Sequence, residues 1–109
     1  MLMLDKKTSI RKETAWALSN IAGGTVDQIQ TIVGNGFVQK LQQMLTDPNE
    51  EYGVKRECLW ALSNCTRGSY KHIEYLLTEC NFLEHLVVFI NSFLAELNKQ
   101  VQIAQKNNY

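Results

Sequence analysis

Hydrophobic residues recur along the chain at helical spacing, and short polar or glycine-containing stretches separate the segments that carry them. Three such segments follow one another at residues 26–33, 37–45 and 50–66. The glycines of Gly34-Asn35-Gly36 predict the end of the first helix, and Pro48 bars the second helix from continuing. No stretch alternates with the two-residue period of a strand. The pattern therefore predicts an all-α protein.

The pentapeptide WALSN occurs twice, at residues 16–20 and 60–64, and the surrounding sequence aligns with the same offset of 44 positions. Further along, Phe37 aligns with Phe82 at an offset of 45, so the second copy holds one additional residue. We assign that residue to the connection 78–81. A repeat in the low forties is typical of helical armadillo or HEAT units.

The repeat predicts a division of the chain into four parts. They are an N-terminal tail (1–8), the third helix of one repeat (9–23), a full three-helix repeat (24–67) and a divergent terminal repeat (68–107). The expected third helix of the last part, LAELNKQVQIAQKNN, has no tryptophan. Gln105 and Tyr109 stand where the Trp and Asn of WALSN would align.

Within each WALSN the Trp and the Asn are four residues apart, so they lie one above the other on one helix face. Leu18 and Leu62 lie about 200° around the helix and are expected in the core. The indoles and carboxamides are then free to face a groove. The alternative is that each Trp is itself a core residue with an incidental polar neighbour. Repetition of both residues together favours the groove.

Such a pair has a clear binding chemistry. Equivalent helices of stacked repeats lie about 8–10 Å apart, which matches about three residues of an extended peptide. An Asn carboxamide can pair with the N–H and C=O of a peptide backbone. Indole faces favour cations and accommodate long aliphatic stems. The expected ligand is an extended, basic peptide.

Glu13 and Glu57 each lie three residues before a Trp and thus on nearly the same face. Their carboxylates can pair with the charged ends of a basic ligand. Alternatively, the basic pairs that precede them, Arg11-Lys12 and Lys55-Arg56, take them into ion pairs within the protein. Both interpretations stay open at this point.

Composition excludes several other functions. Eleven basic and eleven acidic residues balance, so no overall positive field attracts nucleic acid or a membrane surface. The apolar stretch 82–97 is interrupted by polar residues and is too short to span a bilayer. Three cysteines without CxxC spacing predict reduced, buried thiols of a cytosolic or nuclear protein. His72 and His85 lack partners at zinc spacing, and no catalytic or nucleotide-binding motif occurs. We expect no enzyme, no metal and no cofactor.

The segments IRKETAWALSNIAGGTVDQIQTIV and VKRECLWALSNCTRGSYKHIEYLL resemble armadillo repeats of the importin α family. The resemblance implies a right-handed α-solenoid fragment of about two and a third three-helix repeats, in which the third helices line a concave groove. It implies that this groove binds nuclear localisation signal peptides of cargo proteins. The implied peptide-binding residues are Trp16, Asn20, Trp60 and Asn64, with Glu13 and Glu57 as the acidic contacts.

The same resemblance implies a nuclear import adaptor of the cytoplasm and nucleus, or a part of one, and points to the C-terminal, minor signal-binding region. No basic N-terminal arm is present, so importin β is not expected to bind through this chain. Arg67 is expected near the groove, where it would oppose a basic ligand. Exposed Leu2, Leu4, Ile10 or Trp16 at the solenoid end would favour self-association. The alternative function is an armadillo-type scaffold with a vestigial groove.

Overall fold

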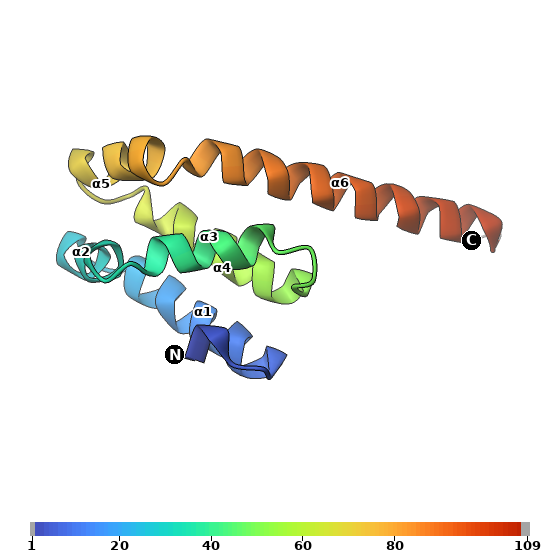
Figure 1. The fold of residues 1–109 in the computed structure, drawn as a ribbon, viewed down its shortest axis with the longest axis horizontal. Helices are drawn as coiled ribbons and strands as arrows, with labels where there is room; N and C mark the ends of the chain where they lie inside the picture. The colour runs from blue at the N-terminus through green and yellow to red at the C-terminus, as the bar shows by residue number, and fades with distance from the viewer. Residues whose placement is uncertain (1, 108–109) are drawn as a thin grey trace.

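A computed structural model describes residues 2–107, and these form helices and no strand. Six α-helices, a 3-10 turn (η1) and a π-helical turn (η2) follow one another along the chain (Figure 1). Their order is η1 (Leu2–Leu4), α1 (Thr8–Ala22), α2 (Val26–Gly34), α3 (Phe37–Thr46), α4 (Tyr52–Cys65), α5 (Tyr70–Glu74), η2 (Tyr75–Glu79) and α6 (Phe82–Lys106). The all-α prediction is confirmed. Tyr109, which aligns with the Asn of WALSN, lies outside the described residues.

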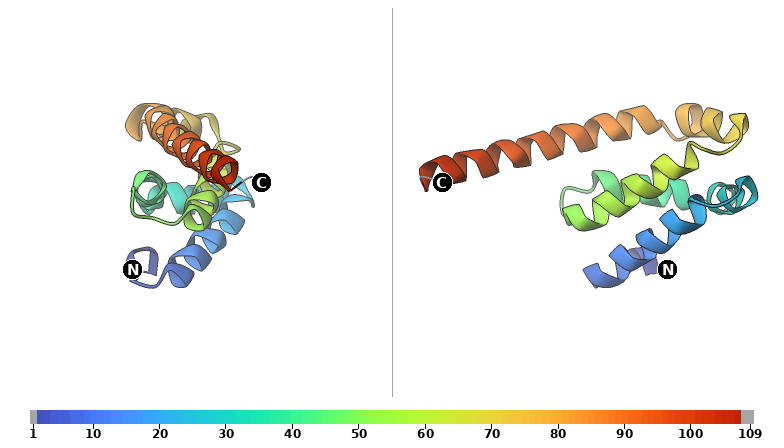
Figure 2. Two further views of the ribbon diagram at one scale, coloured as in Figure 1. Left: turned by 90° about the vertical axis from the view of Figure 1, so that its right-hand side faces the viewer. Right: turned by 180° about the vertical axis from the view of Figure 1, so that it is seen from behind.

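The helices stack in the order of the repeats. α1 packs on α4, α4 packs on α3, and α3 packs on α6 (Figures 1 and 2). α1 and α4 are the two helices that carry WALSN, and they lie side by side as expected of equivalent helices in a solenoid. The stack is elongated, with principal extents of 51 × 28 × 20 Å.

One continuous apolar core runs through the stack. Leu18 and Leu62, the leucines of the two WALSN copies, are both buried, as the sequence predicts. The core is built from α1 to α4, with contributions from η1, η2 and the start of α6. Its fully buried aliphatic members are Met3, Ala15, Ala22, Ile29, Ile32, Val38, Leu41, Leu45, Val54, Ala61, Leu62 and Leu76.

The two repeat units start and stop their helices in the same way. Thr25 caps α2 in a capping box with Gln28, and the backbone N–H of Ser69 donates to Nδ1 of His72 at the start of α5. Gly36 before α3 has a left-handed backbone, and Asn81 before α6 does too, with φ of 50°. Glycine tolerates this conformation freely, and asparagine is among the few other residues that adopt it.

The additional residue of the second unit widens a helical turn, η2, which overlaps the connection 78–81 to which we assigned it. Ser69 matches Thr25 at an offset of 44, whereas Asn81 matches Gly36 at an offset of 45. Between them, the backbone N–H of Cys80 donates to the carbonyl oxygen of Tyr75 at 3.1 Å, across five residues. A single inserted residue thus widens the last turn into the π-helical η2, which is the usual form of such an insertion.

α6 differs most from expectation, because one helix of 25 residues replaces the separate second and third helices that the repeat predicts. In the first unit, Asp47 and Pro48 separate α3 from α4. At the offset of 45, Ser92 and Phe93 occupy these two positions, and neither prevents helical hydrogen bonding. The helix therefore continues, and its C-terminal half projects beyond the rest of the molecule (Figures 1 and 2).

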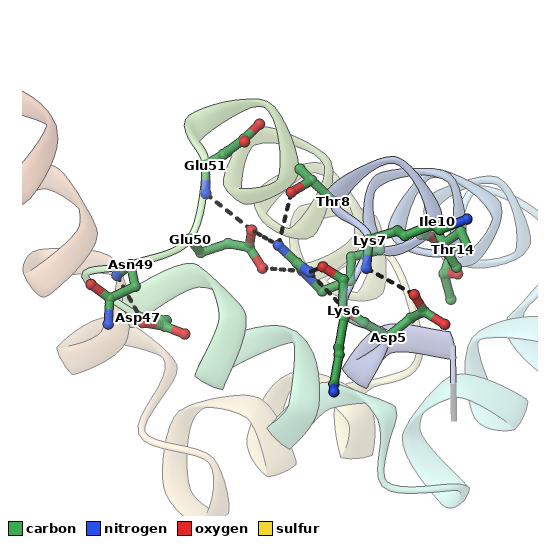
Figure 3. Close-up of polar contacts among 11 residues, drawn as sticks. Asp5, Lys6, Lys7, Thr8, Ile10, Thr14, Asp47, Asn49, Glu50 and Glu51 are labelled. Atoms are coloured by element: carbon green, nitrogen blue, oxygen red, sulfur yellow. Dashed lines mark hydrogen bonds and ion pairs between the residues drawn. The ribbon is translucent and has the colours of Figure 1, made fainter.

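A charged contact ties the N-terminal segment to the turn before α4. The guanidinium of Arg11 donates to both carboxylate oxygens of Glu50, at 2.8 and 2.9 Å, and to the carbonyl oxygens of Asp5 and Lys6 (Figure 3). The hydrogen bond to Glu50 raises the pKa of Arg11. These bonds hold α1 in place, with Met3 buried beneath it.

The outer face of α1 shows what a repeat leaves open when nothing is stacked on it. Ile10, Thr14 and Ala17, together with Leu2, line a hollow of about 540 Å³. Their counterparts in α4 are Val54, Cys58 and Ala61, which are all fully buried. α4 is covered by α1, whereas α1 has no such neighbour among residues 2–107. The side chain of Leu4 lies outside the described residues.

No single helix within residues 2–107 has the length and apolarity to cross a bilayer. Only the pair 70–79 and 82–106, bent by 65°, meets that criterion when taken together.

Candidate peptide-binding groove

The two indoles lie on the surface and are not part of the core. Trp16 is 56% exposed and Trp60 is 60% exposed, although their neighbours Leu18 and Leu62 are buried. The serine of each WALSN copy turns back to the helix: Ser19 Oγ donates to the carbonyl oxygen of Trp16 at 2.6 Å, as Ser63 Oγ does to that of Trp60. Each pentapeptide thus splits between core, helix backbone and surface.

The space between the two indoles forms a groove of about 730 Å³. α1 contributes Trp16 and Asn20, and α4 contributes Glu57 and Trp60. Four of the six residues expected from the sequence therefore line one groove. The remaining lining residues are Ser19, Arg56, Leu59, Ser63, Thr66, Phe82 and Leu86.

A second hollow of about 450 Å³ holds the carboxylates. It is lined by Glu13 and Trp16 of α1 and Glu57 of α4, with Ser9 and Lys12 beside them. Trp16 and Glu57 line both hollows, so the indole and the acidic groups belong to one continuous surface. Glu13 is thereby placed with the other expected residues.

The sequence left open whether neighbouring basic residues pair with the two glutamates. Among residues 2–107, Glu57 has one such ion pair and Glu13 has none. Within residues 2–107, Glu13 makes no hydrogen bond or ion pair, because Arg11 binds Glu50 instead. Lys55 is buried, with its Nζ 4.9 Å from the ring centre of Tyr52. Only Arg56 pairs with Glu57: its Nε lies 3.9 Å from Oε1, with the Arg56 side chain 72% exposed and that of Glu57 17% exposed. The long distance and the exposed guanidinium make this a weak ion pair.

The two asparagines have different environments. Asn20 is exposed and lines the groove, and its side chain makes no hydrogen bond to another residue between 2 and 107. Asn64 is half-buried, and its Nδ2 donates to the carbonyl oxygen of Ser19 on α1 at 2.9 Å. Asn64 lines neither hollow and links the two third helices. It keeps one N–H and its oxygen for further bonds.

Arg67 lies elsewhere than we expected. Its Nη2 donates to the carbonyl oxygen of Gly23 at 3.0 Å, and more weakly to that of Gly24, so it joins the loops that follow α1 and α4. Arg56 is the cation that lines the groove, and our sequence reasoning missed it. Its position four residues before Trp60 was the available signal, because i and i+4 share a helix face.

Phe82 and Leu86 of α6 also line the groove and were missed. No local signal identifies them, because they reach the groove only through the packing of α6 on α3. The cysteines do not contribute to it. Burial raises the pKa of Cys58 to about 12 and that of Cys65 to about 11, and all three thiols are free. No cluster of metal-ligating side chains occurs in the part of the chain that the structure describes.

The stacked α2–α3–α4 unit defines the class of protein. Residues 25–67 match the model of the Armadillo/beta-catenin-like repeat family, so the chain carries an armadillo repeat within an all-α solenoid.

The curated relatives are importin α subunits. The chain is 46% identical to importin subunit alpha-4 of Arabidopsis thaliana over 79 residues, which are 72% of this chain and 14% of that protein. It is 41% identical to importin subunit alpha-B of Dictyostelium discoideum over 39 residues, or 36% of this chain and 8% of that protein. The resemblance to importin α is thus confirmed over part of the chain, which spans a small fraction of the length of these relatives.

Proposed function

We propose that the chain binds extended peptides rich in lysine and arginine, as nuclear localisation signals are, and acts as part of a nuclear import adaptor in the cytoplasm and nucleus. The supporting observation is the pair of exposed indoles on successive third helices, with Glu13 and Glu57 in the adjoining hollow. Exposed apolar groups that line one groove are typical of a protein- or ligand-binding site.

In this proposal each group has its own task. The peptide lies extended across α1 and α4, and aliphatic stems of its basic residues pack against Trp16 and Trp60. Asn20 pairs with the peptide backbone, and Asn64 does so with the groups that its bond to Ser19 leaves over. Glu13 neutralises a ligand cation at low cost, because it has no partner to give up within residues 2–107.

Two Trp/Asn pairs form only a weak binding site. Each Asn contributes about 0.5–1.5 kcal/mol and each exposed cation–π contact about 0.5–1 kcal/mol. The sum of about 2–5 kcal/mol before ordering costs corresponds at best to a dissociation constant of about 0.2 mM, and ordering costs weaken it further. Further repeats on the same chain would strengthen binding through effective concentration.

A second candidate function is an armadillo-type scaffold whose groove is vestigial and whose exposed ends join another chain. Two observations favour it. Asn64 already bonds to Ser19, and the cation of Arg56 lines the groove. The open face of α1 around Ile10 and Ala17 offers the surface for such an assembly.

Titration of a lysine-rich peptide separates the two functions. The chain has two tryptophans, both in the groove, so their fluorescence reports binding directly. We expect the peptide to protect them from acrylamide quenching, and Asn20→Ala/Asn64→Ala to weaken binding by about 10-fold. Asn49→Ala, an exposed asparagine outside the groove, is the matched control and should bind as the wild type does.

The acidic contacts have their own comparison. Glu13→Gln/Glu57→Gln should weaken binding of the lysine peptide and flatten its salt dependence, whereas Glu74→Gln/Glu79→Gln, at exposed positions of α5 and η2, should not. Protection that is absent in the wild type, or equal in the groove variants and their controls, contradicts peptide binding and supports the scaffold.

A further inference from the structure

α6 carries an exposed apolar seam that no part of residues 2–107 covers. Six of its seven members are 43–60% exposed, and the seventh, Ala104, is half-buried. Their spacing is regular, with steps of four and three residues in strict alternation. The seam consists of Leu83, Val87, Ile90, Leu94, Leu97, Val101 and Ala104.

This spacing averages 3.5 residues, which is the period of a left-handed coiled coil and not that of a straight helix on a globular core. The heptad assigns valine, leucine and valine (87, 94 and 101) to the a positions. Leucine, isoleucine, leucine and alanine (83, 90, 97 and 104) occupy the d positions. Three consecutive heptads follow the rule without a polar residue.

The seam is separate from the face by which α6 packs on its own chain. That face is formed by Phe82, Phe89 and Phe93, and the hydroxyl of Tyr52 bonds to Ser92 beside it. The seam lies about 100° around the helix from these rings. Packing of α6 on the other helices of its chain therefore leaves the seam exposed.

The flanks of the seam favour a second copy of the same helix. The e positions are Glu84, Asn91, Asn98 and Gln105, and the g positions are Leu86, Phe93 and Gln100. Charges at e and g normally decide which helices pair, and like charges oppose self-pairing. Here Glu84 is the single charge, so two identical seams meet without repulsion along their length.

A following armadillo unit would cover only part of the seam. In the first unit, Val38, Gln42 and Leu45 of α3 correspond to Val87 and its neighbours at the offset of 45, and they are buried. α3 ends at Thr46, however, whereas the seam continues for four more positions beyond the equivalent point, from Leu94 to Ala104. An occupant of the full seam must itself be a long helix with the heptad period.

We propose that two copies of this chain associate through their α6 helices, seam against seam, in a two-stranded coiled coil. The association buries the half-exposed leucines, valines and isoleucine. It also supports the projecting half of α6, in which no residue is buried by residues 2–107 (Figures 1 and 2).

Sedimentation equilibrium of the full chain tests the proposal. The wild type should approach twice the 12.5 kDa of one chain as its concentration rises. Leu94→Glu/Val101→Glu, in the seam, should raise the dissociation constant at least about 100-fold. Val88→Glu/Ile103→Glu is the matched control, because it places the same charges at equally exposed positions outside the seam, and it should remain dimeric.

Cross-linking provides a measurement that does not depend on a disruptive variant. Leu94 lies at the middle of the seam, so two copies of it are close in either helix orientation. Leu94→Cys should cross-link with a short bismaleimide, whereas Val88→Cys should not, because position 88 lies outside the seam. The native thiols are buried and should give no background cross-linking.

Three outcomes overturn the proposal: a wild type that stays monomeric, equal effects of seam and control variants, or a monomer that co-sediments with phosphatidylserine-containing vesicles through the seam. The last would mean that the seam binds a lipid surface.

Discussion

The two repeat units start alike and end differently. Both begin with a capped helix, and both place a left-handed residue, Gly36 or Asn81, before the next helix. They part at two positions, where Asp47 and Pro48 break the first unit and Ser92 and Phe93 do not break the second. The first unit folds back and stacks α4 on α1, whereas the second continues outward as α6 (Figure 1). A single turn thus decides whether a third helix joins the groove.

The consequence is an uneven distribution of stability. Apart from Phe82 at its start, α6 has no buried residue, whereas α3 and α4 together have eleven. Elements with few buried contacts open at lower free energy than the global unfolding of a protein. We therefore expect the first unit to provide most of the free energy of unfolding of the chain. The second unit should open locally at a lower free energy.

The largest expected effect comes from a cavity in the first unit. Leu62 is fully buried at the centre of α4, so Leu62→Ala should lower the free energy of unfolding by about 2–5 kcal/mol. Leu97→Ala, on exposed α6, should change that of the monomer by less than about 0.5 kcal/mol. Urea unfolding at a concentration that keeps the chain monomeric measures both. Equal losses would mean that the two units are equally important for stability.

Introducing the turn of the first unit into α6 should break this helix into two, as α3 and α4 are separated in the first unit. Ser92→Asp/Phe93→Pro introduces the residues of the first unit, and a proline inside a helix costs about 3 kcal/mol or more. Circular dichroism should show a loss of helix, and hydrogen exchange should show faster exchange beyond position 92. Ser92→Asp alone keeps the backbone bonds and serves as the control. Unchanged helicity in the double variant would show that this turn does not determine the length of α6.

Local signals were sufficient to predict most of the first unit. Gly36 and Pro48 mark helix boundaries, and the four-residue spacing of Trp60 and Asn64 places them on one face. The repeat alignment predicts a break in α6 near Ser92, but no proline or glycine there encodes one, so the helix continues. The bond from Asn64 to Ser19 spans two repeats, so its geometry follows from helix stacking and not from local pattern.

A smaller effect concerns a polar group in the core of the first unit. Gln42 is 2% exposed, and its Nε2 has no hydrogen-bond partner within residues 2–107. An unsatisfied buried donor costs about 1–3 kcal/mol, so Gln42→Met should raise the free energy of unfolding by about 1 kcal/mol. Gln43→Met, at the exposed neighbouring position, should be neutral. A destabilised Gln42→Met would indicate that the amide finds a partner in solution.

The smallest effect distinguishes the units by thiol chemistry. Burial raises the pKa of Cys58 to about 12 and that of Cys65 to about 11, from an ordinary value of 9.0, and it raises the pKa of Cys80 as well. Because the thiolate is the reactive form, all three should resist iodoacetamide in the native state at neutral pH. Local opening should expose Cys80 first, because it lies in the second unit. Mass spectrometry of partially labelled protein identifies the site.

The same thiols predict the sign of the alkaline response. A folded-state pKa above the unfolded one means that the native state binds protons more tightly, so stability is complete below pH 9 and declines as the pH rises towards about 12. Cys58→Ala removes the largest of these shifts and should reduce the slope of the unfolding free energy against pH in that window. Cys80→Ala should reduce it less. If Cys58 were labelled as fast as Cys80, the first unit would open as readily as the second, and the contrast between the two units would be restricted to the length of α6. An unchanged slope in Cys58→Ala would show instead that burial does not raise the pKa of this thiol.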